Sequence, residues 1–79
     1  MSKQKEIDSV MINYSSGVTR VYSGEVAVAI KGRMIDLMKY DVPVMIIDKE
    51  SNRELHFKPK NIELIEVYYK EEEEENEKL

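Results

Sequence analysis

The feature that most constrains this chain is the segment VPVMII at positions 42–47, in which every side chain is apolar. A run of this length is too short for a buried helix and is typical of a strand. Pro43 restricts the preceding residue to extended backbone angles, so a helix before it ends there. An uninterrupted apolar strand is typical of a sheet that is covered on both faces. We therefore expect residues 42–47 to form a central strand buried on both faces.

The residues after this run predict the second arm of a hairpin. DKESN at 48–52 is rich in turn-forming residues. RELHFK at 53–58 alternates between polar and apolar side chains, which predicts a strand with Leu55 and Phe57 pointing inward.

A last strand is predicted at IELIEVYY, residues 62–69, after a tight connection at PKN, residues 59–61. Its apolar spacing changes from three residues to two along the segment. A bulge or a short 3₁₀ turn near Leu64 reconciles the two spacings.

The first part of the chain predicts another hairpin. IDSVMINY at 7–14 and VTRVY at 18–22 are rich in β-branched and apolar residues, and SSG at 15–17 separates them. A three-residue connection that ends in glycine is typical of a hairpin with a G1-type bulge.

Between the two hairpins, the spacing of apolar residues predicts an amphipathic helix over residues 24–40, with Ser23 as its cap. A strand is the competing interpretation, because EVAVAI alternates and Gly32 costs a helix about 1 kcal/mol relative to alanine. The spacing continues past Gly32, which favours the helix. The apolar positions that recur at helical spacing are Ala27, Ile30, Met34, Leu37 and Met38.

The predicted order ββαβββ indicates an α+β fold in which the helix packs on a mostly antiparallel sheet. We expect one domain at 7–69, a disordered lead-in at 1–6 and a disordered acidic tail at 70–79. The alternative is a small β-barrel of the SH3 or Sm-like kind. The spacing of the last predicted strands resembles that of the final strands in such a barrel.

The chain contains no cysteine, so disulfides and thiolate metal sites are excluded. A 79-residue chain without disulfides or a structural metal buries a small core, so we expect homodimerisation through a sheet edge. No secretory signal is evident at the N-terminus, and the longest apolar run is too short to span a bilayer. We expect a cytoplasmic protein without membrane contact.

The net charge of −4 is located in the last ten residues. Residues 1–69 contain ten basic and ten acidic side chains, whereas residues 70–79 contain six glutamates and two lysines. A block of like charges repels itself and is often disordered. We interpret the tail as a solvated end; mimicry of DNA phosphates and a switch against the domain's own cations are the other interpretations.

The sequence predicts no enzyme and no cofactor or metal. His56 is the single histidine, and Glu54 on the same predicted strand face is its nearest candidate partner. Asp48 and Glu50 lack the spacing of an EF-hand loop. A polar hairpin turn explains the presence of these two acidic residues. The nucleophile, phosphate-binding and dinucleotide motifs that would indicate catalysis are absent from the sequence.

The predicted function is therefore a small protein-interaction module, of the kind that phages and mobile elements encode to modulate a larger host protein. Tyrosine is enriched at interfaces, and in a strand the doublet at 68–69 places one ring in the core and the other outside. Met34 and Met38 are expected to pack adaptably behind this surface. The residues predicted to form the interface are Phe57, Ile65, Val67, Tyr68 and Tyr69.

The alternative prediction is a nucleic-acid-binding or regulatory module. It requires basic side chains that gather on one face, because phosphate contacts dominate affinity for nucleic acid. The candidate contacts, drawn from the helix and the second hairpin together with one residue of the first, are Arg20, Lys31, Arg33, Arg53, Lys58 and Lys60.

Overall fold

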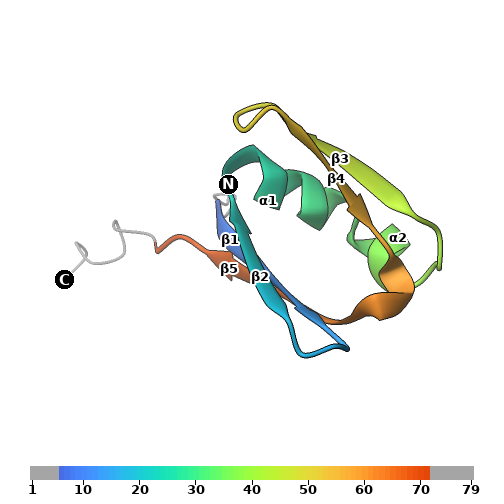
Figure 1. Ribbon diagram of the computed structural model, residues 1–79. Coiled ribbons are helices and arrows are strands. Elements are labelled where there is room, and N and C mark those ends of the chain that lie inside the picture. The colour runs from blue at the N-terminus through green and yellow to red at the C-terminus, as the bar shows by residue number, and fades with distance from the viewer. Residues whose placement is uncertain (1–5, 72–79) are drawn as a thin grey trace.

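The computed structural model describes residues 6–71 (Figure 1). Its elements follow the predicted order, and the fold is α+β. They are β1 (Ile7–Tyr14), β2 (Thr19–Ser23), α1 (Gly24–Gly32), α2 (Met34–Met38), β3 (Val44–Asp48), β4 (Arg53–Phe57), the 3₁₀ helix η1 (Pro59–Asn61) and β5 (Ile62–Tyr69).

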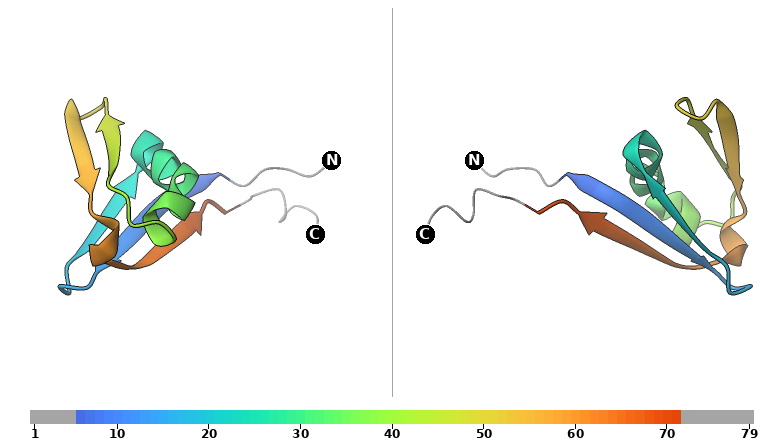
Figure 2. Two further views of the ribbon diagram at one scale, coloured as in Figure 1. Left: turned by 90° about the vertical axis from the view of Figure 1, so that its right-hand side faces the viewer. Right: turned by 60° about the vertical axis from the view of Figure 1, so that its left-hand side comes forward.

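The strands form two antiparallel sheets instead of one. One sheet has the order β2-β1-β5, and the other is the β3-β4 hairpin. The sheets approach each other near η1 and diverge toward the opposite end, where α1 fills the space between them (Figure 2). The described strands do not close into a barrel, so the barrel alternative is wrong.

The β1–β2 hairpin has the predicted turn. Gly17 adopts a φ of 98°, a left-handed conformation that glycine reaches without a steric penalty. Its N–H donates to the Tyr14 carbonyl, and the Tyr14 N–H donates to the Val18 carbonyl, both at 2.9 Å. The predicted hairpin is confirmed.

The predicted helix over 24–40 is interrupted. Arg33 leaves helical geometry, with φ −106° and ψ 18°, and separates α1 from the single turn of α2. The break follows Gly32, and glycine has a low helix propensity, as is evident from the sequence. Ala27, Ile30 and Leu37 are buried as predicted, whereas Met38 is 48% exposed.

The central-strand prediction for residues 42–47 is wrong. The strand begins at Val44 and pairs only with β4. Val44 and Ile46 point inward and are buried, but Met45 is 44% exposed and Ile47 is 57% exposed. The reason is that α1 packs against one face of this hairpin, and no described element covers the other. A hydrophobic run does not by itself reveal whether a second layer exists.

The turn between β3 and β4 is organised by Asp48, which is 6% exposed. Its carboxylate accepts hydrogen bonds from Arg53 Nε at 2.9 Å and from the Ser51 N–H at 3.3 Å. These bonds stabilise the charged form, and the bond from Arg53 contributes most to lowering the pKa of Asp48. The carboxylate is therefore bonded within the hairpin, which agrees with the turn interpretation of DKESN.

The predicted irregularity near Leu64 is confirmed. Asn13 pairs with Leu64, but Tyr14 pairs with Ile62, so Glu63 is an extra residue on β5. This bulge changes which side chains of β5 face the core, and it explains the change of apolar spacing in the sequence.

The core lies between the β2-β1-β5 sheet, α1 and the inner face of the hairpin. Across one side of it, the rings of Tyr22 on β2 and Phe57 on β4 meet edge to face, with centroids 6.0 Å apart. The buried hydrophobic residues are Val10, Ile12, Val26, Ala27, Ile30, Leu37, Val44, Ile46 and Phe57.

Candidate protein-interaction edge

β5 is the longer of the two edge strands in the three-stranded sheet. It has eight residues and pairs with β1 along one side, whereas β2, at the opposite edge, has five. Within residues 6–71 no strand pairs with the outer side of β5. An unpaired edge is a template to which another strand can add.

The direction of the β5 backbone follows from one hydrogen bond at its end. The Lys70 N–H donates to the Glu6 carbonyl at 2.8 Å, so residue 70 faces β1. Successive residues of an antiparallel strand turn their backbone groups to alternate sides. The N–H and C=O groups of Ile65 and Val67 therefore point away from β1, toward the outer edge of the sheet.

The side chains of Ile65 and Val67 lie on the inner face of the sheet. They lie opposite Ile12 and Val10 of β1, whose side chains are both 0% exposed. Ile65 and Val67 are themselves only half-buried. The cause is the position of α1, which packs chiefly on β1, β2 and β3 and leaves the β5 side of this face less covered.

The tyrosine doublet closes β5, and both rings are outside the core. Tyr68 is 45% exposed and Tyr69 is 41% exposed, so the prediction that one of them is buried is wrong. These residues lie at the end of the strand, where Asp8 bulges out of β1 between the pairs of Ile7 with Tyr69 and Ser9 with Tyr68. The end of the sheet therefore lies outside the span covered by the core.

On the outer face of the sheet, the Tyr68 hydroxyl donates to Glu66 Oε1 at 2.6 Å. This bond to a carboxylate stabilises the neutral phenol and is the main reason why the pKa of Tyr68 is raised. The bond holds an aromatic ring and a charge in place beside the edge.

The remaining predicted interface residue lies elsewhere. Phe57 is 3% exposed and packs in the core against Tyr22, so it is not on the surface that β5 presents. The structure brings Ile65, Val67, Tyr68 and Tyr69 together on one strand. Met38, expected behind them, lies on α2, which contacts η1.

The six cations proposed for nucleic acid are divided over the molecule. Arg33 Nε is 2.9 Å from Asp36 Oδ2, and Arg53 Nε is 2.9 Å from Asp48 Oδ2, so both guanidinium groups are already paired. Arg53 begins β4, whereas Lys58 and Lys60 lie beyond its other end. The length of a strand separates them.

His56 and Glu54 share the outer face of β4, as predicted. His56 Nε2 is 3.1 Å from Glu54 Oε1, and the two side chains are 68% and 62% exposed. The pair lies on an open strand face. A general base at this position would work in bulk water, without the enclosed environment that tunes catalytic groups.

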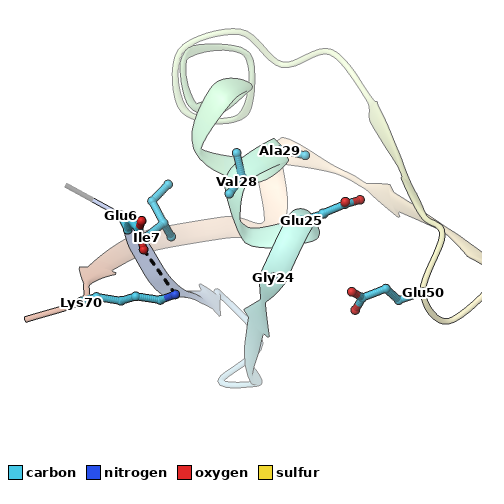
Figure 3. Close-up of a pocket in the computed structure, with 8 residues that line it drawn as sticks. All are labelled: Glu6, Ile7, Gly24, Glu25, Val28, Ala29, Glu50 and Lys70. Atoms are coloured by element: carbon cyan, nitrogen blue, oxygen red, sulfur yellow. Dashed lines mark ion pairs between the residues drawn. The ribbon is translucent and has the colours of Figure 1, made fainter. Parts of the chain in front are cut away.

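An open groove of about 660 Å³ lies between the start of α1, the first residue of β1 and the β3–β4 turn (Figure 3). Glu25 and Glu50 lie on one side of it, and the ion pair between Glu6 Oε1 and Lys70 Nζ, at 3.6 Å, lies on the other. Among the residues that the structure describes, no three acidic or histidine side chains are arranged to hold a metal ion.

Two features of the surface were missed from the sequence. Met45 and Ile47 are exposed on the outer face of β3. Their exposure was missed because the apolar run was interpreted as a strand buried on both faces. Glu6 and Lys70, assigned to the disordered ends, continue the β1–β5 pairing through their backbone bond. The rest of the predicted lead-in, 1–5, and of the tail, 72–79, lies outside the described residues.

No protein-family model matches the chain, and neither a curated protein nor a solved structure is significantly similar to it. In the described part of the chain, no helix has the length and apolar character needed to cross a bilayer.

Proposed function

We propose that the protein is a non-enzymatic protein-interaction module that binds by adding an extended strand of another polypeptide to the outer edge of β5. The observation that carries this proposal is the backbone of Ile65 and Val67, which points outward from an edge strand. In strand addition, main-chain hydrogen bonds supply affinity, and the flanking side chains supply specificity.

The side chains around this edge support the same function. Ile65 and Val67 offer apolar area that the domain itself covers incompletely, and Tyr68 and Tyr69 add two exposed rings at the end of the strand. Aromatic rings with a polar tip are enriched at protein interfaces. The added strand would gain backbone hydrogen bonds together with apolar contact.

A pair of proline variants tests the proposal. Val67→Pro removes an outward N–H of β5, and Val21→Pro removes an outward N–H of β2, because the bond from Tyr14 to the Val18 carbonyl turns residue 21 away from β1. Proline is tolerated at edge positions whose N–H faces solvent. The two substitutions are therefore matched in residue type and backbone position, on opposite edges of one sheet.

The assay is capture of proteins from nuclease-treated lysate by the full chain and by both variants, each shown by circular dichroism to be folded. We expect a stoichiometric partner on the wild type and on Val21→Pro that is absent from Val67→Pro. A partner retained equally by all three proteins would contradict strand addition at β5.

A further inference from the structure

We infer that the strand added to β5 is the β5 of a second copy of this chain, paired antiparallel about a two-fold axis. This inference rests on the proposed strand-addition function and names its partner. The result would be an isologous dimer in which the three-stranded sheet continues into that of the other copy.

The chain that precedes β5 is basic and the chain that follows Lys70 is acidic, which favours this partner and its direction. Lys58 and Lys60 precede the strand; both are exposed, and neither forms an ion pair within the described residues. Glutamates occupy all of positions 71–75 after the strand. Antiparallel pairing would direct the acidic sequence that follows Lys70 in one copy toward the lysines that precede β5 in the other. Parallel pairing would place like charges together, which is unfavourable.

The register of the β5–β5 pairing is limited by the charge of Glu66 and by the bulge at Glu63. A two-fold axis at Glu66 would set this residue directly opposite its own copy, and like charges in that position destabilise a sheet. An axis at Ile65 would extend the pairing into the bulge at Glu63. An axis at Val67 pairs residues 65–69 of the two copies with one another, so within β5 it avoids both problems. It sets Glu66 opposite Tyr68 of the other copy, the same pair of groups that already bond within one chain.

The pairing also meets a need of the fold. An open strand edge is a template for indiscriminate pairing, and symmetric pairing closes the β5 edge of both copies. In the dimer, the outward N–H and C=O groups of Ile65 and Val67 would form hydrogen bonds with the second copy. The second copy would also cover more of their half-buried side chains. The second edge of the sheet, β2, is shorter and carries Arg20 in the row of Ile12.

Sedimentation velocity of the full chain, over a series of concentrations from low micromolar upward, tests the inference. We expect a reversible monomer–dimer equilibrium for the wild type and for Val21→Pro. Val67→Pro should be monomeric throughout while retaining its circular dichroism spectrum. A dimer that Val67→Pro leaves intact would overturn the inference, because it would use another surface.

A second set of variants tests the role of charge without touching the strand. Lys58→Glu combined with Lys60→Glu, or removal of residues 71–79, should weaken the dimer about fivefold at low salt, because each change removes exposed ion pairs. Lys31→Glu combined with Lys49→Glu changes the net charge equally, away from β5, and should have less effect. Equal weakening by both lysine pairs would contradict an antiparallel arrangement guided by the ends of β5.

The two proposals fail in different ways. A wild type that stays monomeric at every concentration overturns self-pairing, and Val67→Pro-sensitive capture of another protein would still support the interaction module. Dimers that are sensitive to Val67→Pro, together with capture that is insensitive to it, would support self-pairing and contradict the proposed binding of other proteins at this edge.

Discussion

The two edges of the three-stranded sheet differ although both strands pair with the same strand, β1. At the β2 edge, Tyr22 continues the row of Val10 and its ring packs against Phe57 of the other sheet. At the β5 edge, Val67 continues the same row from the other side, and its side chain is only half-buried. The β2 edge is joined to the second sheet by the aromatic contact between Tyr22 and Phe57, whereas the inner side chain of β5 in the same row is less covered.

The difference arises because the large buried side chains of this small domain are concentrated near β1. The rows of inner side chains that cross the sheet are centred on β1, where Val10 and Ile12 are 0% exposed. A single helix of nine residues covers β1 and β2 and extends to β3. The β5 edge therefore retains apolar side chains and outward backbone groups together, which is the combination that strand addition uses.

The largest expected effect compares the same substitution at the centre and at the edge of one row. Ile12→Ala should lower the free energy of unfolding by about 2–5 kcal/mol, because it leaves a cavity in the core. Ile65→Ala, directly opposite on β5, should cost about 1 kcal/mol, because the side chain is half-buried. Urea unfolding at the lowest workable concentration, where self-association is minimal, measures both. Equal losses would mean that the β5 edge is covered as fully as β1.

A smaller effect, confined to alkaline pH, tests the burial of Tyr14 beside Tyr22 on the β2 edge. Burial, followed by the neighbouring Tyr22, raises the pKa of Tyr14 from 10.0 to about 12. The unfolded state therefore loses this proton at lower pH than the folded state. The resulting stability is fully present below pH 10 and is lost as the pH rises toward 12. Tyr14→Phe should remove this part of the alkaline loss in urea-unfolding curves. If the variant retains the whole pH dependence, the Tyr14–Tyr22 contact does not shield the phenol.

Local features were predictable from the sequence because nearby residues determine them. The conformation of Gly17 follows from the length of the first hairpin loop, and the bulge at Glu63 follows from the change of apolar spacing in β5. The inward direction of Leu55 and the outward direction of His56 follow from alternation along β4.

Features that depend on the placement of distant elements were not predictable in this way. The exposure of Met45 and Ile47 depends on the absence of a layer outside β3, which no residue near them encodes. Alternation predicts the inward direction of Phe57, but its assignment to the interface was wrong, because its ring contacts Tyr22, which is remote in sequence. In the candidate site, β5 and its tyrosines were identified from composition, whereas the free backbone edge became apparent only from the strand order.

The most direct test of an open, pairing-competent β5 edge is amide hydrogen exchange of individual residues, measured across a range of protein concentration. In dilute solution we expect Glu66 and Tyr68, whose N–H groups face β1, to exchange slowly, and Ile65 and Val67 to exchange quickly. At high concentration Ile65 and Val67 should become protected, while Val21 on the opposite edge stays unprotected. Protection of Ile65 and Val67 that is already complete in dilute solution, or that never changes with concentration, would contradict the account.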